Sequence, residues 1–255
     1  MDLQRACEAL RRGEIVLLYD ADGREEETDM VIASEHATPQ ALRTLRGDAG
    51  GLVCTTLAPE HHRLLGLPWL SDVLQGAAAQ HPVLRAMVPD DITYDASKPA
   101  FGITVNHRST FTGITDADRA TTIQELATFC QAAAGRDAAV VQAEFGAAFR
   151  TPGHVTLLNG QDDGLAARQG HTELSIELLR QAGLTPSATI CEMLGRDGRA
   201  LSRADAEAYA KAHGLVFLTG AAVVAAWRQR TPAPRPATRA RQRLASMAPV
   251  PTSAS

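Results

Sequence analysis

The chain alternates between two spacings of apolar residues, and each spacing predicts one type of secondary structure. Short runs rich in Val, Ile and Leu are typical of buried strands, whereas apolar residues three and four positions apart are typical of amphipathic helices. The predicted strands are 14–20, 29–35, 51–57, 102–107, 154–158, 187–194 and 215–220. The predicted helices are 2–13, 38–50, 59–66, 118–134, 171–183, 202–214 and 221–230.

The order of these elements predicts the fold class. Because strands and helices alternate along the chain, we expect an α/β fold with a largely buried mixed sheet. Thr38 followed by Pro39 is a typical helix start, and Gly183 is a typical helix end. The prolines between Pro59 and Pro99 predict long loops. No internal repeat or domain boundary is visible before residue 231, so residues 1–230 are expected to form a single domain.

The last 25 residues differ in composition from the rest of the 255-residue chain. Residues 231–255 contain four Arg, five of the 13 Pro and no acidic residue, which predicts a disordered Pro/Arg-rich tail. The alternative is an arm that docks on an anionic surface. Without this segment, 21 basic and 29 acidic side chains remain, so the body has a net charge of −8. An acidic body argues against nucleic-acid binding, because phosphate contacts need a basic surface.

Hydropathy and cysteine spacing indicate the cellular location of the protein. No run of about 18 uncharged apolar residues is present, and the N-terminal residues do not resemble a signal peptide. The four cysteines lie far apart without a Cys-x-x-Cys pair, so they are predicted to be free thiols. We therefore expect a cytoplasmic protein that does not bind membranes.

An acidic segment runs from Asp20 to Asp29 between two predicted strands, with six carboxylates and one Arg. These carboxylates repel one another, and a hard divalent cation would offset the repulsion. The segment lacks the spacing of an EF-hand calcium loop and of a glycine-rich phosphate loop. The alternative is a solvated acidic hairpin.

A second cluster, Arg168-Gln169-Gly170-His171-Thr172, precedes a predicted amphipathic helix. Backbone N–H groups at a helix N-terminus, an Arg and a Thr hydroxyl can together bind a phosphate group, and His171 could ligate a metal. The alternative is ordinary helix capping with a surface histidine.

Three further positions could contribute to chemistry, although each also has an ordinary structural explanation. Thr112 lies in a polar turn, His154 enters a strand, and Glu192 ends a strand. Five histidines have no partner pattern and are predicted to lie on the surface, namely His36, His61, His62, His81 and His213. The residues alone thus predict a metal-assisted enzyme that acts on a phosphorylated metabolite.

Several longer motifs occur in a fixed order between residues 3 and 220. They are Asp20-x-Asp-x-Arg-Glu-x-Glu-Thr-Asp29, DAGGLVCTTL, VNHRSTFTGITDADRATTI, PGHVTLL, RQGHTE and CEML-x-RDG. Together they closely resemble the 3,4-dihydroxy-2-butanone 4-phosphate synthase family of riboflavin biosynthesis. The resemblance implies a three-layer α/β fold, a homodimer with active sites at the subunit interface, and a need for Mg²⁺ or Mn²⁺. The implied reaction converts D-ribulose 5-phosphate to L-3,4-dihydroxy-2-butanone 4-phosphate and formate.

The resemblance also implies roles for individual positions. The implied metal ligands are Glu25 and His171, and Cys54 matches a pocket cysteine. The implied catalytic residues are His154, Glu192, Asp20 and Glu27. The implied substrate-binding residues are Arg24, Glu25, Asp29, Thr112, Arg168, Gln169, Gly170, His171, Thr172 and Glu192.

Two positions depart from the pattern of the family. Glu26 stands where relatives usually carry Gly or Asn, and Asn159-Gly160 replaces an expected Arg-Ala pair. The departures leave two alternatives open: a paralogue that performs a related metal-assisted enolisation on another sugar phosphate, and a non-catalytic sugar-phosphate-binding protein. The retention of His154 and Glu192 favours the synthase, because a protein that only binds would not need acid–base residues.

Overall fold

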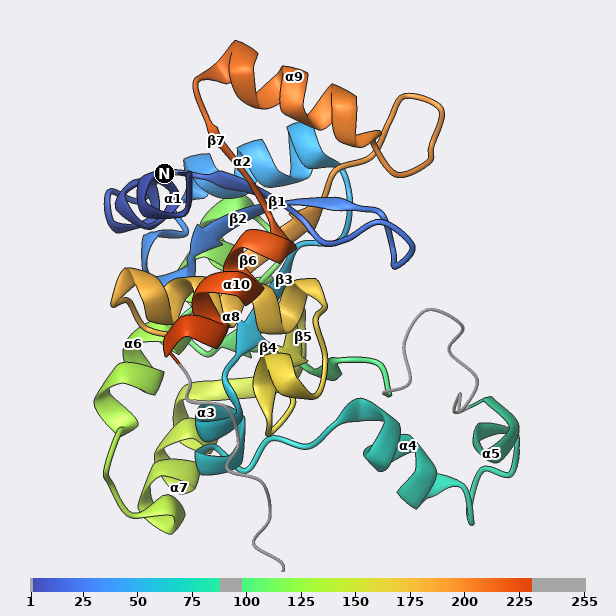
Figure 1. The fold of residues 1–255 in the computed structure, drawn as a ribbon. Coiled ribbons are helices and arrows are strands. Elements are labelled where there is room, and N and C mark those ends of the chain that lie inside the picture. Colours follow the sequence, from blue (N-terminus) through green and yellow to red (C-terminus); the bar gives the residue numbers. More distant parts are fainter. Residues whose placement is uncertain (1, 88–97, 231–255) are drawn as a thin grey trace, which may run out of the picture.

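The computed structural model describes residues 2–87 and 98–230, which form one seven-stranded mixed sheet flanked by helices (Figure 1). The strand order is β4-β5-β3-β6-β2-β1-β7. The strands are β1 (Val16–Tyr19), β2 (Thr28–Ala33), β3 (Cys54–Leu57), β4 (Phe101–His107), β5 (Phe149–Asn159), β6 (Ala188–Glu192) and β7 (Val216–Thr219). β3 is parallel to β5 and β1 to β7, whereas the other neighbours are antiparallel. The predicted α/β class is therefore confirmed.

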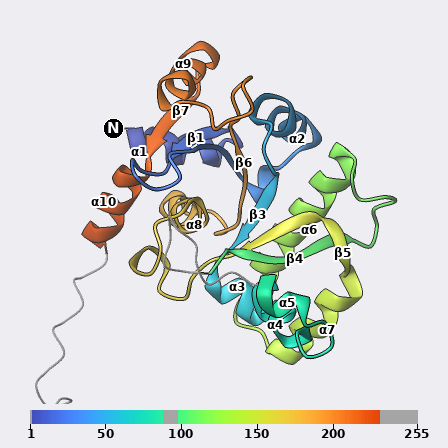
Figure 2. The same cartoon turned by 90° about the vertical axis from the view of Figure 1, so that its right-hand side faces the viewer.

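Helices cover both faces of the sheet and make three layers (Figure 2). One face carries α1 (Asp2–Arg11), α8 (His171–Ala182) and α10 (Gly220–Arg230). The other carries α2 (Pro39–Thr44), α6 (Asp116–Ala133), α7 (Ala138–Ala148) and α9 (Arg203–His213). Shorter helices are α3 (Pro59–Leu64), α4 (Leu70–Ala77), α5 (Val83–Met87) and three single turns at Ser34–His36, Leu45–Ala49 and Gly164–Ala166.

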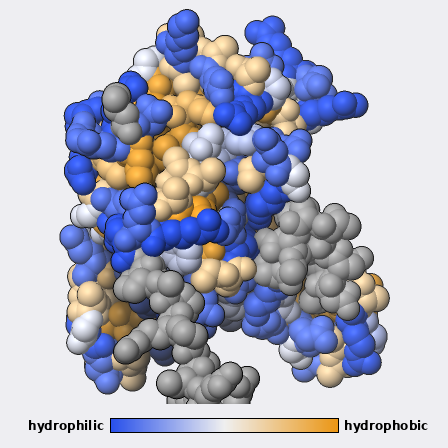
Figure 3. All heavy atoms as spheres, in the orientation of Figure 1, coloured by the Kyte–Doolittle hydropathy of each residue, from blue (hydrophilic) through white to orange (hydrophobic). Residues whose placement is uncertain are grey.

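Strands such as β1 supply side chains to two separate apolar cores, because successive residues of a strand point to opposite faces. In β1, Leu17 packs in the core that contains Ile123 of α6, whereas Leu18 packs in the core that contains Leu174 of α8. Burial of one such side chain contributes about 1.5–3 kcal/mol. Hydrophilic side chains cover much of the outer surface, and apolar surface remains visible around α1 and α10 (Figure 3).

Capping residues set several helix boundaries where the sequence predicted them. The Thr38 hydroxyl accepts a hydrogen bond from the Ala41 N–H at the start of α2. Gly183 ends α8 with a left-handed φ of 69°, a conformation that glycine adopts without steric cost. The four cysteines are buried free thiols, as predicted. No helix among the described residues is long and apolar enough to cross a membrane.

Parts of the secondary structure differ from the prediction. Two short helices, α4 and α5, occupy the region that was expected to form loops, and residues 88–97 lie outside the described part. Helix α7 was not predicted, because its apolar residues do not follow one face. Strand β5 begins at Phe149 rather than at residue 154, since it continues to pair with β4 beyond a register shift. The predicted tail, 231–255, also lies outside the described residues.

The prediction that His61 and His62 lie on the surface was wrong. Helix α3 packs beneath the segment that follows β5, so both side chains are buried. The His62 Nε2 atom lies 3.1 Å from the Gly160 carbonyl oxygen, and the ring contacts Trp69 edge-on. These two histidines are structural residues of this layer.

Candidate active site

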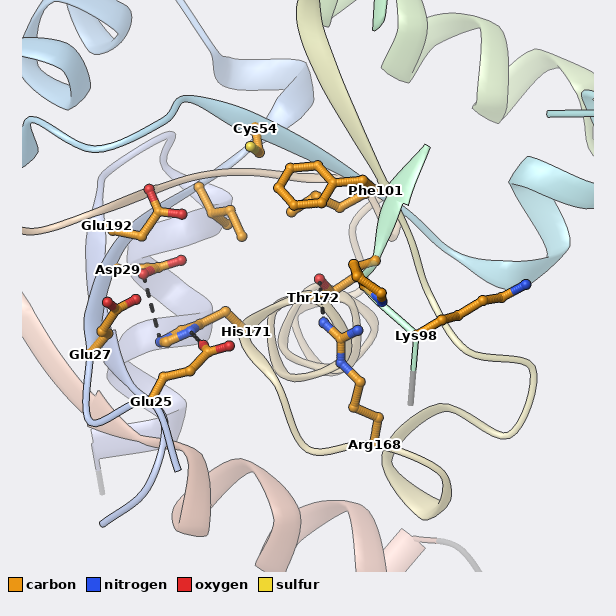
Figure 4. A pocket seen from close by; sticks show the side chains of 14 residues that line it. Glu25, Glu27, Asp29, Cys54, Lys98, Phe101, Arg168, His171, Thr172 and Glu192 are labelled. Atoms are coloured by element: carbon orange, nitrogen blue, oxygen red, sulfur yellow. Dashed lines mark hydrogen bonds and ion pairs between the residues drawn. The ribbon is translucent and has the colours of Figure 1, made fainter. Parts of the chain in front are cut away.

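A cavity of about 280 Å³ opens where the acidic β1–β2 segment meets the N-terminus of α8 (Figure 4). Eight residues singled out in the sequence line it, namely Glu25, Glu27, Asp29, Cys54, Arg168, His171, Thr172 and Glu192. Four carboxylates lie on one side, Arg168 and Thr172 lie on the other, and His171 lies between them. The fold thus joins two clusters that are far apart in the sequence.

Asp20 organises the acidic segment from within. Its buried carboxylate accepts hydrogen bonds from the backbone N–H groups of Glu25 and Glu27, each at 3.1 Å. The Arg24 guanidinium also donates to Asp20, at 3.1 Å, and lies 2.8 Å from the Glu25 carboxylate. These contacts fold the segment into a tight turn that presents Glu25 and Glu27 to the cavity. Asp20 itself does not line this cavity.

His171, the first residue of α8, has a hydrogen-bond acceptor at each ring nitrogen. Its Nδ1 lies 3.4 Å from the Glu25 carboxylate, and its Nε2 lies 3.2 Å from the Leu18 carbonyl oxygen. The Asp29 carboxylate is 3.7 Å from Nε2. Since the Leu18 carbonyl and the Glu25 carboxylate can accept a hydrogen bond from each ring nitrogen, this arrangement stabilises the imidazolium form of the ring.

The charges of this cluster shift its pKa values. Burial acts to lower the pKa of His171, but Asp29, Glu25 and Asp20 outweigh it and raise that pKa to about 9. Burial acts to raise the pKa of Glu25, but His171 and Arg24 outweigh it and lower that pKa to about 2. For Asp29, burial prevails over the attraction of His171 and raises the pKa to about 7. Asp29 can therefore gain or lose a proton near neutral pH.

Asp20, Glu25 and His171 can each turn one ligand atom toward a common point, and these atoms lie within 4.8 Å of one another. Two carboxylates and one imidazole are a donor set that suits Mg²⁺ or Mn²⁺. Glu25 and His171 were expected as ligands, whereas Asp20 was expected as a catalytic residue only. A bound cation would take over the role that the His171 proton plays in holding these carboxylates together.

The opposite end of the cavity is suited to an anion. The Arg168 guanidinium lies 3.0 Å from Glu173 and 3.3 Å from the Thr172 hydroxyl, at the N-terminus of α8. A Cβ atom at Gly170 would lie 2.6 Å from an Arg24 nitrogen and 2.9 Å from an Arg168 nitrogen. Gly170 therefore leaves room for both guanidinium groups beside the N-terminus of α8, and Arg168 is the one that lines this cavity. An Arg beside helix N–H groups is suited to phosphate binding. Gln169 lines a neighbouring cavity together with Arg24.

Glu192 is held at the end of β6 opposite Asp29 of β2. Its carboxylate accepts a hydrogen bond of 2.8 Å from the Leu52 N–H, and Gly51 leaves the space that it occupies. Burial, followed by the Glu25 charge, raises the pKa of Glu27 nearby. The cavity therefore holds carboxylates with different affinities for protons.

Six expected site residues do not line the cavity. Asp20, Arg24, Gln169 and Gly170 lie directly behind its lining, whereas Thr112 and His154 lie elsewhere in the fold. Thr112 follows β4 and His154 lies in β5, and both are joined to the buried side chain of Asn106. Six residues that the sequence did not indicate also line the cavity, among them Lys98 and Phe101. Lys98 lies in the proline-rich region without a motif, so no local pattern marked it.

Comparison with known proteins supports the family resemblance. A family model described as 3,4-dihydroxy-2-butanone 4-phosphate synthase matches residues 4–226. The chain belongs to this family. It is 51% identical over 223 residues to the 3,4-dihydroxy-2-butanone 4-phosphate synthase of Methanothermobacter thermautotrophicus, covering 87% of this chain and 94% of the relative. The Methanosarcina mazei synthase is 42% identical over 229 residues, which cover 89% and 91% of the two chains.

Solved structures of the 3,4-dihydroxy-2-butanone 4-phosphate synthase family share the fold. One in complex with two magnesium ions has a TM-score of 0.66 at 29% identity and covers 89% of this chain and 96% of its own. A two-domain synthase from A. baumannii has a TM-score of 0.70 at 31% identity and covers 91% of this chain and 59% of its own. The three-layer fold is confirmed, and the magnesium complex agrees with the expected metal cofactor.

Proposed function

We propose that this chain converts D-ribulose 5-phosphate to L-3,4-dihydroxy-2-butanone 4-phosphate and formate, with Mg²⁺ or Mn²⁺ held by Glu25 and His171. One observation carries the proposal: the metal-ligand candidates and the Arg168–Thr172 anion site face each other across one small cavity (Figure 4). A sugar phosphate has a carbonyl and hydroxyl oxygens at one end and a phosphate at the other, so it matches both ends of this cavity.

The anion end would fix the position of the substrate. Arg168 and the Thr172 hydroxyl can donate hydrogen bonds to phosphate oxygens, and the N-terminal N–H groups of α8 add a favourable dipole. Gly170 keeps this surface open to the phosphate. Such anchoring holds the reacting carbons near the carboxylates, which lowers the entropic part of the barrier.

The acidic end would carry the chemistry. A divalent cation held by Glu25 and His171 would supply a Lewis acid that polarises substrate oxygens. Asp20 keeps Glu25 in place through its backbone hydrogen bond, so its contribution here is to position the turn. Arg24 offsets the charge of both carboxylates.

The product has a methyl group where the substrate has a hydroxymethyl group. The reaction therefore needs removal of a proton from a carbon next to the ketone, loss of a hydroxyl group as water and later protonation of carbon. The product also has one carbon fewer than the substrate, so the carbon skeleton must rearrange and water must add for that carbon to leave as formate. Asp29, Glu27 and Glu192 line the cavity and are suited to these transfers. Burial raises the pKa of Asp29, so this carboxylate accepts a proton more readily than Glu25 does.

We also propose that the protein is a homodimer in which His154 and Thr112 of one copy complete the cavity of the other. Both residues lie outside the cavity of their own chain. The turn beside them exposes Phe111, with 92% of its surface accessible, and Ile114. Apolar side chains this exposed favour burial against another protein.

A phosphorylated substrate and product also support the predicted cytoplasmic location.

The test is formate release from D-ribulose 5-phosphate by the purified protein with added Mg²⁺. We expect turnover that EDTA abolishes and Mg²⁺ restores, and a loss of at least about 100-fold in Glu25→Gln. Glu207→Gln is the matched control, because Glu207 is an exposed carboxylate on α9 and should leave turnover unchanged. Absence of formate, with no effect of EDTA, would overturn the proposal.

Two further outcomes would favour the alternatives. Turnover of another sugar phosphate in place of this substrate, without growth of a riboflavin auxotroph that expresses the chain, would indicate a paralogue. Calorimetric binding of the sugar phosphate without turnover would indicate a non-catalytic binding protein.

A further inference from the structure

The buried side chain of Asn106, in β4, joins the two site residues that lie outside the cavity. Its Oδ1 accepts a hydrogen bond of 2.8 Å from the His154 backbone N–H. Its Nδ2 lies 3.3 Å from the Thr112 carbonyl oxygen and 3.2 Å from Nδ1 of the His154 ring. One amide thus contacts a backbone donor, a backbone acceptor and a ring nitrogen.

The backbone contacts fix which way this amide points. The His154 N–H can only donate, so it requires the amide oxygen on its side. The Thr112 carbonyl can only accept, so it requires the amide nitrogen on the other side. Both requirements select the same orientation, and a flipped amide would lose both hydrogen bonds.

The fixed amide decides where the proton of the His154 ring lies. The amide nitrogen donates to Nδ1, so Nδ1 must be the unprotonated acceptor of the neutral ring. A neutral imidazole carries one proton, and here that proton is on Nε2. His154 is exposed, and its Nε2 has no hydrogen bond with the described residues. The ring therefore presents an N–H group outward.

The backbone around Asn106 restrains the orientation of its amide. Gly113 and Gly153 lie so close that a Cβ atom on either would collide with Asn106 or with the backbone beside it. Arg150 donates to the carbonyl oxygens of Thr110 and Phe111, each at 3.1 Å, which holds the neighbouring turn in place. Three separate positions, Gly113, Gly153 and Arg150, thus restrain the amide and its two partners.

We infer that Asn106 is a positioning residue that holds neutral His154 as the Nε2–H tautomer, so that His154 acts on the substrate as a hydrogen-bond donor rather than as a general base. This inference rests on the proposed function, in which His154 reaches the substrate. The Nε2–H group would donate to a substrate oxygen on which negative charge develops. No proton needs to leave the ring, because a hydrogen bond alone stabilises that charge.

The tautomer can be measured without any activity. In a ¹⁵N-labelled full-length protein at alkaline pH, long-range ¹H–¹⁵N correlation distinguishes protonated from unprotonated ring nitrogens. We expect the shift of an unprotonated nitrogen at Nδ1 of His154 and of a protonated one at Nε2, with the signals assigned by their loss in His154→Gln. A protonated Nδ1 in the wild-type protein would overturn the inference, whether or not the protein releases formate.

The variant Asn106→Asp tests the positioning role. A carboxylate can only accept, so His154 should switch to the Nδ1–H tautomer, whereas His213, which stacks on Tyr209 far from β4 in sequence, should keep its spectrum. For the wild-type reaction we expect kcat to fall about 100-fold in this variant, as for loss of one oxyanion donor, with a smaller change in KM. An unchanged tautomer, or a switched tautomer with unchanged kcat, would contradict the positioning role. If the variant does not fold, the wild-type spectrum still decides the tautomer.

Discussion

At the scale of single residues, His171 illustrates how one side chain serves two states of the site. Without a cation, its imidazolium form neutralises part of the charge of Glu25 and Asp29. With a cation, one ring nitrogen must lose its proton to become a ligand. The sequence motif could identify His171, but only the structure shows that the Leu18 carbonyl and two carboxylates stabilise the protonated ring.

Metal binding should therefore release a proton. The pKa of His171 is raised to about 9, so below that pH the metal competes with a proton, and the competition weakens as pH rises. We expect the apparent affinity for Mn²⁺ to increase about tenfold per pH unit between about pH 6.5 and 8.5. Calorimetry in buffers of different ionisation enthalpy measures both the affinity and the proton released. An affinity that does not depend on pH would show that His171 is not a ligand.

Glu26 is the residue of the acidic turn with an unusual backbone conformation. Its φ of 57° lies in the left-handed region, which costs a residue with a side chain about 1–2 kcal/mol and costs glycine little. This gives a physical reason for the Gly or Asn expected there in relatives. The Glu26 carboxylate offsets part of the cost, since it accepts a hydrogen bond of 2.7 Å from the Gly23 N–H.

A pair of variants separates the backbone strain from this hydrogen bond. Glu26→Ala and Glu26→Gly both lose the carboxylate, but only glycine relieves the left-handed strain. We expect the glycine variant to be more stable than the alanine variant by about 1 kcal/mol, measured as the free energy of unfolding in urea. At Glu207, inside α9, the order should reverse, because alanine favours a helix. Equal stability of the two Glu26 variants would argue against a left-handed residue there.

At the scale of elements, the helices and strands with a strong apolar periodicity could be predicted from the sequence, whereas those with a weak periodicity could not. The strands and the helix α8 followed from apolar spacing and from caps such as Gly183. Helix α7 could not be predicted, because it packs through Val141 and Phe145 while Val140 stays exposed. The order of strands in the sheet also depends on long-range pairing, which no local pattern encodes.

The same distinction applies to the candidate site. The acidic turn and the Arg168–Thr172 cluster are contiguous motifs, so the sequence could indicate both. Asn106 and Lys98 act through contacts with distant residues, such as Asn106 with His154 and Lys98 with Asp72, so only the fold could reveal them. Sequence motifs therefore indicated several candidate site residues, and the fold shows which side chains each of them contacts.

The start of α8 offers a test of the anion site. In Gly170→Ala, the new methyl group would meet the guanidinium groups of Arg24 and Arg168, which must move, while the backbone keeps an ordinary φ of −87°. We expect KM for D-ribulose 5-phosphate to rise about tenfold, which corresponds to about 1.4 kcal/mol of lost binding. Steady-state kinetics measures this change.

The matched control is Gly76→Ala in α4, where a methyl group meets no atom within 4 Å. That variant should keep the KM of the wild-type protein and gain about 0.5–1 kcal/mol of stability from its higher helix propensity. If Gly170→Ala also left KM unchanged, the phosphate would have to bind elsewhere.

At the scale of the whole molecule, the cavity of one chain holds only part of the expected site. Glu25 and His171 line it, whereas His154 and Thr112 do not. The exposed Phe111 and Ile114 lie on the same turn as Thr112. An apolar surface suited to burial against another protein therefore lies next to the site residues that are outside the cavity. A two-fold dimer would place each such turn against the other copy, because both copies present the same surface.

Mixing two inactive variants tests whether each site is shared between copies. Glu25→Gln removes a ligand from the cavity, and His154→Gln removes a residue outside it. In a dimer with one variant of each kind, shared sites would give one intact site and one site with both changes. Random exchange of subunits makes about half of the dimers mixed, so we expect about a quarter of the wild-type formate release.

If each active site were instead formed by one chain alone, the mixture would recover no formate release, because every chain would carry one inactivating change. The measurement therefore requires that each variant alone is nearly inactive and that subunits exchange, for example after dilution and reconcentration of the mixture. Mixing Glu25→Gln with Glu25→Ala is the control, since both changes fall in the same half of the site and no dimer would be intact. Recovery in the first mixture alone would place His154 across the interface from Glu25, whereas no recovery despite verified exchange would assign both residues to one chain.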